Sequence, residues 1–196
     1  GEALSEGELA SAPQPRAYPF IYACIAQAGG HFTYSQTRTV GTGFEATVNE
    51  KRAYFESAYN RSFVKVDGAS FEISTQYGKG YAAGTAVPDP GFAFAGWNTD
   101  GSDKAAFTSQ YFDAYASGGQ FIVYAVFEPH PNTVSFDANY GSGGPSGSVI
   151  ATYGEAMPTI PTTAPIRTGY EFEGWYDDRT GGKQYYTAAG ASARNW

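Results

Sequence analysis

An internal repeat limits the possible folds of this chain more than any other feature of its sequence. The pattern Gly-aromatic-x-Phe-x-Gly-Trp occurs at residues 91–97 and again at 169–175, a separation of 78 residues. Upstream of the two copies, Tyr77-Gly78 corresponds to Tyr153-Gly154, and 64–68 corresponds to 134–138, with a longer Gly/Ser loop in the second copy. Three landmarks in the same order predict two copies of one structural unit.

The repeated motif residues have a direct physical interpretation. They are Gly91, Phe92, Phe94, Gly96 and Trp97 in the first copy, and Gly169, Tyr170, Phe172, Gly174 and Trp175 in the second. Glycine at a strand end permits a kink or a close backbone approach, which lets the following indole pack over the sheet. The alternate aromatic residues share one face of a strand, and burying each contributes about 2–3 kcal/mol before conformational entropy is subtracted. Trp97 and Trp175 are therefore predicted to be core residues rather than ligand-stacking ones.

Short aromatic and β-branched runs, separated by Gly, Pro, Asn or Asp, predict a β-rich structure. The expected strands cover residues 20–26, 63–66, 71–75, 121–127, 133–136, 149–153 and 170–175. The run 121–127 is apolar on both faces, so it is expected to be a central strand that is covered on both sides. One short helix is expected at 103–115, with Asp103 as N-cap and with Phe107, Tyr111 and Tyr115 spaced four apart along one face.

The repeat also divides the chain into segments. The strand 121–127 closes the first copy, and at the same offset 53–55 resembles the closing strand of an earlier, degenerate unit that lacks the Gly-Trp motif. We expect a tag remnant and linker at 1–16, from which any signal peptide has been removed, a degenerate β module at 17–62, a divergent repeat at 63–131 and a repeat at 132–196. Residues 17–131 can alternatively form one larger β domain, whereas Pro129 and Pro131 mark the firmer boundary.

Composition narrows the possible functions. The 196 residues include 12 basic and 19 acidic side chains, a net charge of −7, so the electrostatic attraction that drives nucleic-acid binding is missing. No run of about 18 apolar residues occurs, so we expect no direct membrane insertion. Cys24 is the only cysteine, which excludes an internal disulfide and zinc sites built on paired cysteines.

Few sequence motifs here are typical of catalytic or metal-binding sites. Asn98–Asp103 has oxygen donors but lacks the residue order and distal acid of a calcium loop, so a turn followed by a helix cap is expected. Asp177 and Asp178 are neighbours whose side chains point apart in an extended chain, which favours a turn over a catalytic pair. Cys24 and Gln27 have the Cys-x-x-Gln spacing of internal thioesters, yet the alternating apolar run around them favours a buried cysteine. No Ser-His-Asp cluster, phosphate loop or HExxH motif occurs, so we expect no enzyme, no cofactor and no metal site.

The last copy closely resembles the Listeria–Bacteroides repeat, also called the internalin B-repeat. The segments that carry the resemblance are 133–141, 153–158, 167–176 and 181–186; it is strong over 132–196, and 63–130 resembles a divergent copy. The resemblance implies a β-rich α+β fold of tandem small β-grasp (ubiquitin-like) modules in secreted or cell-wall-attached bacterial proteins. The family's closing strand would follow Trp196, so the last unit is expected either to lack that strand or to be completed by a neighbouring element.

The same resemblance implies a non-catalytic extracellular module of a bacterial surface or secreted protein. Such a module serves as a stalk, spacer or adhesion segment, packed beside neighbouring repeats of the same chain. An alternative is direct binding of an extracellular host protein or glycan through exposed tyrosines such as Tyr140, Tyr176 and Tyr185. Covalent capture through a thioester between Cys24 and Gln27 is a third alternative. Binding predicts a contiguous exposed aromatic patch, whereas a stalk predicts tyrosines that are scattered singly.

Overall fold

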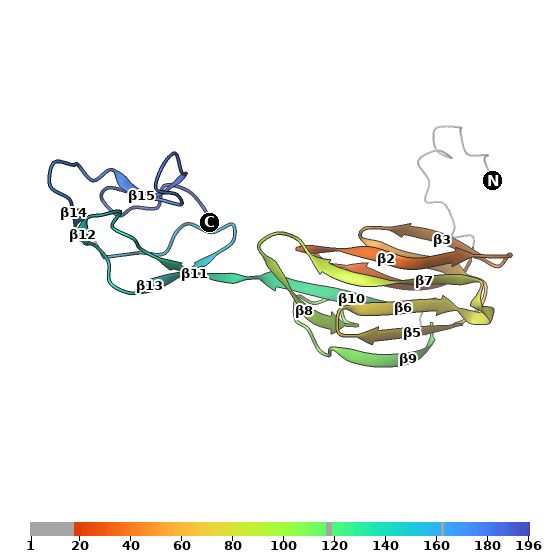
Figure 1. Cartoon of the computed structure of the whole chain (residues 1–196). Helices are drawn as coiled ribbons and strands as arrows, with labels where there is room; N and C mark the ends of the chain where they lie inside the picture. The colour runs from red at the N-terminus through yellow and green to blue at the C-terminus, as the bar shows by residue number, and fades with distance from the viewer. Residues whose placement is uncertain (1–17, 117–118, 162) are drawn as a thin grey trace, which may run out of the picture. The chain divides into compact units, whose positions relative to one another are not determined.

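The strands gather into two units that make their contacts mainly within themselves. In the computed structural model, residues 18–116, 119–161 and 163–196 are described, and the tag remnant and linker predicted at 1–16 lies outside them. One unit contains the described residues up to Val87 together with Phe94–Val126, and the other contains Pro88–Ala93 together with Phe127–Trp196. Figure 1 shows the strands of each unit.

The described part of the first unit is a sandwich of two five-stranded sheets. One sheet has the spatial order β3 (Phe44–Asn49), β4 (Arg52–Ser57), β1 (Phe20–Ala26), β10 (Gln120–Pro129) and β8 (Phe92–Asn98). The other has the order β2 (Gly30–Thr39), β7 (Gly80–Pro88), β6 (Ser70–Thr75), β5 (Arg61–Asp67) and β9 (Ser109–Tyr115), and these strands lie side by side in Figure 1. Phe32 and Phe71 of the second sheet pack against Trp97 of the first, with ring centroids 6.1 and 5.8 Å from the indole. The core therefore lies between the two sheets.

Alternation of the side chains explains why these segments are strands. Along β5, Ser62, Val64 and Val66 are buried, while the residues between them face outward. The expected central strand is β10, which lies between β1 and β8 and buries both Val123 and Val126. The face with Val123, Ala125 and Phe127 is buried, whereas on the opposite face Val126 is buried and Ile122 and Tyr124 are only half-buried. The expected cover is therefore complete on one face only.

The helix predicted at 103–115 is wrong. Ser109–Tyr115 is strand β9, which pairs antiparallel with β5 at the edge of its sheet, and Asp103 caps no helix. A spacing of four residues fits either structure, because every fourth residue lies on one face of a helix and also on one face of a strand. Ala114 is buried whereas Tyr111 and Tyr115 are exposed, so a period of two describes the segment.

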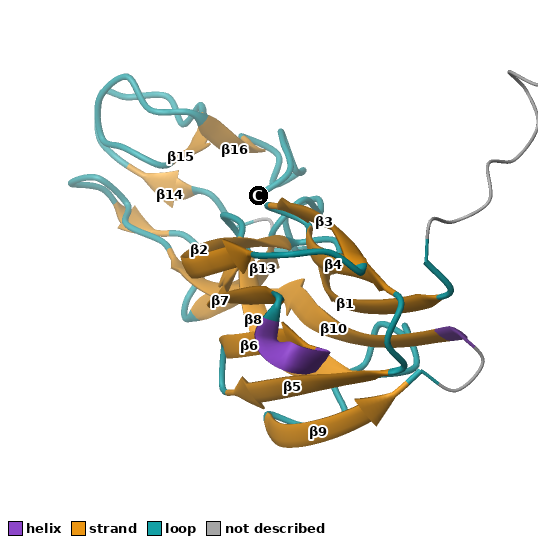
Figure 2. Ribbon diagram, turned by 90° about the vertical axis from the view of Figure 1, so that its right-hand side faces the viewer, coloured by secondary structure: helices purple, strands orange, loops and turns teal. Residues whose placement is uncertain are grey.

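The α+β β-grasp fold is also wrong for this chain. No α-helix lies in the part of the chain that the structure describes, where turns and the short 3-10 helix η1 (Gln76–Gly78) join the strands (Figure 2). A β-grasp sheet packs on a helix, whereas the first unit packs one sheet on another. The one segment where a helix was expected contains β9, whose pairing with β5 satisfies its backbone polar groups.

The sandwich combines the N-terminal segment 18–57 with the first repeat. Strand β1 runs parallel to β10, with Cys24 opposite Val123, and antiparallel to β4, with Cys24 opposite Ala53. From the same N-terminal segment, β2 lies beside β7 in the other sheet. Both sheets thus contain strands from each of these two segments.

Among its described residues, the second unit contains three two-stranded sheets. They pair β11 (Pro131–Ser135) with β13 (Ser148–Thr152), β12 (Ser142–Gly143) with β14 (Pro165–Ile166), and β15 (Gly174–Tyr176) with β16 (Gln184–Thr187). Its buried core contains Ala151, Met157, Ile160 and Tyr186. The strand expected at 170–175 forms only at its end, because 170–173 has no strand partner among the described residues.

The two repeats share their strand register. Val64 lies opposite Ile73 in the β5–β6 hairpin, and Val134 lies opposite Val149 in the β11–β13 hairpin. These pairs correspond when the two copies are aligned on the landmarks of the sequence. The repeated pattern therefore specifies one hairpin twice, although the two units cover that hairpin differently.

Candidate functional site

The Gly-Trp motif has the same backbone conformation in both repeats. Gly96 and Gly174 each have φ of 137°, and a Cβ atom on Gly96 would lie 2.8 Å from the carbonyl oxygen of Phe107. Trp97 forms a bridge with Phe107, and Trp175 pairs with Tyr186. Each glycine therefore permits the close backbone approach that the sequence predicts.

The other motif residues differ more between the two repeats. Gly91 has φ of 84° and Gly169 has φ of 80°. Phe94 meets the Trp97 ring at 5.7 Å, and Phe172 meets the Trp175 ring at 5.3 Å, both edge to face. Phe92 contacts Tyr153 inside the second unit, with ring centroids 5.7 Å apart. Tyr170 differs from Phe92, since it belongs to no strand and is 67% exposed.

The two tryptophans have different surroundings. Trp97 is fully buried, and its Nε1 donates a hydrogen bond of 2.7 Å to the carbonyl oxygen of Gly68. Trp175 is half-buried and packs against Phe136, with ring centroids 5.0 Å apart. The same contrast holds for three hairpin positions, which are buried in the first repeat and half-buried in the second: Val64 and Val134, Val66 and Phe136, Ile73 and Val149. The interior of the second repeat is thus partly open.

That opening is a cavity of about 1120 Å³ within the second unit. Its inner wall is aromatic and includes Phe136, Phe172, Trp175, Tyr185 and Trp196. Its outer wall carries the charged side chains Asp137, Arg167, Glu171, Glu173, Asp177, Asp178 and Arg179. An aromatic wall beside convergent polar groups is typical of a ligand site.

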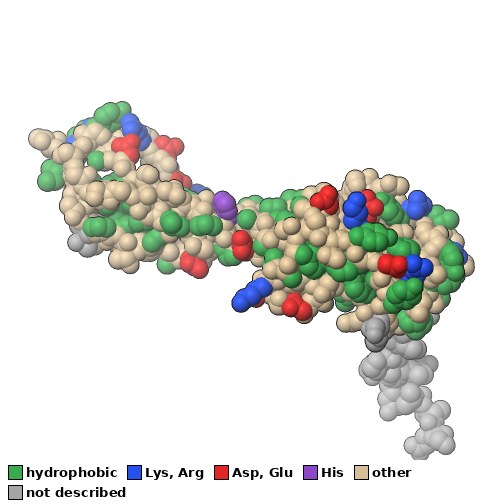
Figure 3. Space-filling model, turned by 90° about the horizontal axis from the view of Figure 1, so that it is seen from below, with side chains coloured by type: hydrophobic (Ala, Val, Ile, Leu, Met, Phe, Trp, Pro, Cys, Tyr) green, Lys and Arg blue, Asp and Glu red, His purple; other side chains and the backbone are tan. Residues whose placement is uncertain are grey.

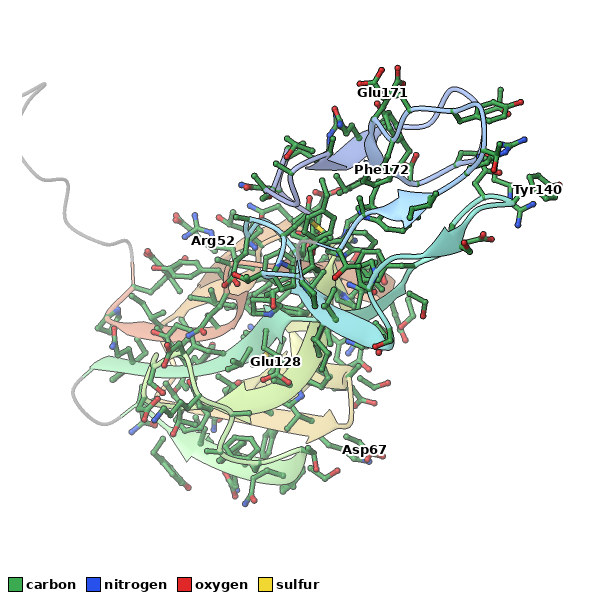
Figure 4. The ribbon with its side chains drawn as sticks, turned by 90° about the vertical axis from the view of Figure 1, so that its left-hand side faces the viewer. Arg52, Asp67, Glu128, Tyr140, Glu171 and Phe172 are labelled. Atoms are coloured by element: carbon green, nitrogen blue, oxygen red, sulfur yellow. The ribbon has the colours of Figure 1, made fainter. Side chains whose placement is uncertain are left out.

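A tyrosine–arginine cluster stands at the edge of this cavity. The Arg167 guanidinium lies 3.8 Å from the centre of the Tyr170 ring and 5.6 Å from that of Tyr140, and Arg179 lies 5.0 Å from the Tyr140 ring. Tyr140 is 79% exposed, and in Figure 4 it lies at the outer end of its loop, with Glu171 pointing away from the ribbon. We call Tyr140, Arg167, Tyr170 and Arg179 the rim cluster. It is a contiguous exposed aromatic patch of the kind that ligand binding predicts.

The loop that carries Tyr140 is held in an uncommon conformation. Asn139 and Tyr140 have φ of 48° and 67°, in the left-handed region that costs a non-glycine residue about 1–2 kcal/mol. Asp137 Oδ1 accepts a hydrogen bond of 2.9 Å from the Asn139 amide, and Arg167 Nη1 donates one of 3.3 Å to the Asn139 carbonyl. These two contacts stabilise the loop and fix the position of the exposed ring.

The carboxylate of Asp137 couples this loop to pH. The hydrogen bond from the Asn139 amide, and then the ion pair with Arg179 at 2.6 Å, hold the pKa of Asp137 below its ordinary value of 3.8. Because the folded pKa is depressed, this stabilisation is present at neutral pH and is lost as the pH falls through the folded value. We expect the Asn139 amide resonance to shift on acid titration with a midpoint below 3.8. The shift should vanish in Asp137→Asn, and a midpoint at or above the ordinary value would contradict the contact.

The tyrosines predicted as a ligand surface occupy different places. Tyr176 is exposed and lines the cavity, and Tyr185 is half-buried against Trp196, with ring centroids 5.3 Å apart. Tyr140 belongs to the rim cluster. The sequence analysis did not identify Arg167, Arg179 or the exposure of Tyr170. Glu171 and Glu173, which alternate with the aromatic residues of the second motif, were a sequence signal that one face of this segment is exposed.

The loop with calcium-like oxygen donors is a turn. The Asn98 amide donates to the carbonyl oxygens of Ser102 and Lys104, both at 2.9 Å, and Asp100 accepts from the Ser102 amide. These polar groups therefore form hydrogen bonds within the loop itself. Among the described residues, no group of three or more His, Cys, Asp or Glu side chains is placed to hold a metal ion.

Cys24 is fully buried in β1, and burial raises the pKa of its thiol. Gln27 donates from its side-chain amide to the Ser102 carbonyl at 2.8 Å, which uses the group that a thioester would lose as ammonia. We expect no alkylation of the native protein by iodoacetamide and one adduct after unfolding in guanidinium chloride, measured by intact mass. A native mass lower by one ammonia, or rapid native alkylation, would contradict this buried thiol.

Comparison with known proteins identifies the family. The sequence profile described as the Listeria-Bacteroides repeat domain matches residues 59–126 and 133–195. The chain therefore belongs to the Listeria-Bacteroides repeat family.

Longer bacterial proteins contain similar segments. The chain is 32% identical over 129 residues to a protein of Evansella cellulosilytica described as a Gly-rich membrane protein, covering 62% of this chain and 13% of that protein. It is 28% identical over 164 residues to Internalin H of Listeria monocytogenes, covering 81% of this chain and 27% of that protein. The chain thus spans about a quarter or less of the length of these relatives. No solved structure matches it.

The described residues also bear on membrane association. Nowhere in residues 18–116, 119–161 and 163–196 does the structure place a helix with the length and apolar character needed to cross a bilayer. Acidic and basic side chains lie among neutral ones on the face seen in Figure 3.

Proposed function

We propose that this chain is a non-catalytic repeat segment of a bacterial surface or secreted protein, where it serves as a spacer and presents a ligand site on its second repeat. The observation that supports the spacer role is the pair of family matches, residues 59–126 and 133–195. The two matched repeats have the same hairpin register, and only six residues lie between them. Repeats joined by short connections fix reach and orientation without a catalytic centre. Internalin H and the Gly-rich membrane protein support a surface location, because segments of both resemble this chain.

The location can be tested on intact cells. Antibodies raised against the purified chain are expected to label intact bacteria that produce the protein, and external protease is expected to remove the label. Matched antibodies against a cytoplasmic protein should label only permeabilised cells. Labelling of this chain that also requires permeabilisation would contradict a surface location.

The rim cluster and the cavity favour ligand binding as a second role. A contiguous exposed patch of Tyr140 and Tyr170 is what ligand binding predicts, and a pure spacer does not need one. The Arg167 guanidinium contacts the exposed rings of Tyr140 and Tyr170. Aromatic side chains that line the cavity lie next to this cluster. We propose that this surface carries the adhesion function of the segment.

A further inference from the structure

A separate group of aromatic and basic side chains lies at one end of the first unit. It gathers where β2 ends, in the turn between β4 and β5, and at η1 between β6 and β7 (Figure 1). Lys79 Nζ lies 5.7 Å from the centre of the Tyr59 ring, which meets the Tyr77 ring edge to face at 5.1 Å. Arg38 joins them, because its Nε and Nη2 both donate to the Gly78 carbonyl at 3.3 Å. We call Arg38, Tyr59, Tyr77 and Lys79 the loop cluster.

Backbone contacts hold the loop cluster in place. Lys79 Nζ donates a hydrogen bond of 3.1 Å to the Thr42 carbonyl, and the Val40 amide donates one of 2.8 Å to the Lys79 carbonyl. Tyr77 is 71% exposed and Val40 is 58% exposed. The cluster therefore presents an open ring and an apolar side chain beside two positioned cations. Positioning before a ligand arrives lowers the entropy that binding must overcome.

The two cations of the loop cluster are not neutralised by a carboxylate. Arg38 and Lys79 bond to backbone carbonyls, and among the residues that the structure describes neither forms an ion pair. Arg61, another cation at this end of the sandwich, differs because Asp113 pairs with it at 2.6 Å. Arg38 and Lys79 thus form a local positive spot on a chain whose net charge is −7. Such a spot attracts an anionic group.

The second repeat lacks this positive spot. Its copy of the Tyr-Gly landmark is followed by Glu155, whereas the first copy is followed by Lys79. Tyr153 of the second repeat is 45% exposed, compared with 71% for Tyr77. The shared glycine has positive φ in both copies, 66° and 79°, so both make the turn. The turn therefore requires neither the lysine nor the highly exposed ring, and both are specific to the first repeat.

We propose that the loop cluster binds a glycan that carries carboxylate groups, such as a chain of uronic acids. The site lies in the first unit, and it depends neither on the spacer role nor on the rim cluster. The Arg38 guanidinium is a planar fork of donors that matches a carboxylate, and its Nη1 is not used by the contact with Gly78. The Lys79 ammonium has donors beyond the one that Thr42 accepts. The C–H face of the sugar ring packs on the ring of Tyr77.

The size and the chemistry of the loop cluster favour this class over others. Two cations balance one or two carboxylates, whereas nucleic acid or a heavily sulfated glycan brings excess negative charge that the acidic chain repels. A neutral glycan leaves the attraction of the cations unused, and a cationic ligand is repelled by them. Acidic peptides offer carboxylates but no flat C–H face for the exposed Tyr77 ring. A uronic acid presents its carboxylate and its C–H face on one ring.

Surface plasmon resonance of the full chain tests the proposal, with polygalacturonate and alginate attached to the sensor through their reducing ends. We expect binding to at least one of them, and at least tenfold weaker binding to the esterified form of that polymer, which keeps the sugar chain and loses the charge. Added salt should weaken binding, because ions screen exposed charges. Arg38→Gln, Lys79→Gln and Tyr77→Ala should each weaken it about tenfold. Heparin, polyglutamate and an oligothymidylate represent the competing ligand classes.

Lys104→Gln is the matched control for the charge variants. Lys104 is an exposed cation of the first unit, but its loop accepts a hydrogen bond from Gln27, which follows the other end of β1. The variant removes the same charge, so it should leave binding within about twofold of the original. Near-ultraviolet circular dichroism should show that every variant is folded.

Several results would overturn the proposal. They are equal binding to free and esterified polymers, an equal loss in Lys104→Gln, unchanged binding in the loop-cluster variants, binding to heparin, polyglutamate or the oligothymidylate alone, and no binding to any polymer. Surface labelling of intact cells would stand in all of these cases. Failure here is therefore distinct from failure of the proposed location.

Discussion

Replacing Trp97 with alanine is expected to lower the free energy of unfolding of the first unit by about 3–5 kcal/mol. The indole is fully buried between the two sheets, where it packs against Phe32 and Phe71 and bonds to the Gly68 carbonyl. Its removal leaves a large cavity and an unpaired carbonyl oxygen. Trp175→Ala is expected to cost the second unit only about 1–2 kcal/mol, because Trp175 is half-buried.

Hydrogen exchange followed by mass spectrometry separates these two effects. Peptides from the β5–β6 hairpin report on the first unit, and peptides from the β11–β13 hairpin report on the second. Trp97→Phe is the control for the hydrogen bond, since it keeps an aromatic ring and loses only the N–H group and part of the volume. Equal losses of protection for Trp97→Ala and Trp175→Ala would show that the second repeat is as well covered as the first.

Gly96→Ala is expected to destabilise the first unit by at least about 2 kcal/mol. Two effects combine, because the backbone has φ of 137° and the new Cβ would lie 2.8 Å from the Phe107 carbonyl oxygen. Gly174→Ala should act in the same way in the second unit, where the Tyr186 carbonyl lies closer still. The strand that carries each tryptophan would have to move away from its partner.

Open turns provide the matched controls. Gly68 and Gly169 also have positive φ, of 56° and 80°, but a Cβ atom on either would meet nothing within 4 Å. Alanine at these positions is expected to cost only the left-handed conformation, about 1 kcal/mol. Urea unfolding of the four variants measures the difference. If Gly96→Ala lowered the free energy of unfolding no more than Gly68→Ala, the close backbone approach at Gly96 would not contribute to stability.

The strands were predictable because their information is local. β1 has the bounds expected from its run of apolar residues, and β10 is central because both of its faces are apolar. The repeat located the two motif glycines and the two corresponding hairpins. The helix at 103–115 failed because a spacing of four does not distinguish a helix from a strand, and pairing with β5 decides the matter. The strand expected at 170–175 formed only from Gly174 onward, because an alternating pattern needs a paired neighbour to become a strand.

The candidate site was predictable only in part. Tyr140, Tyr176 and Tyr185 were expected to be exposed; the first two are, whereas Tyr185 is half-buried. Tyr170 was expected only as a motif residue on a strand face and Arg167 was not singled out, since their meeting with Tyr140 depends on a loop far away in sequence. The contrast between Ala93 and Glu171 was visible in the sequence, but only the cavity shows why the difference matters.

By itself, the sequence determined the repeated unit, its β-rich character, its family, and the glycines that the turns require. These features depend on residue type and on spacing within a few residues, which the chain encodes directly. Tertiary structure alone decided that β1 pairs with β10, that sheet packs on sheet instead of on a helix, and that the same motif is buried in one repeat and open in the other. Such outcomes depend on which distant surfaces can cover an apolar face. Burial is a property of the whole fold, and no local pattern records it.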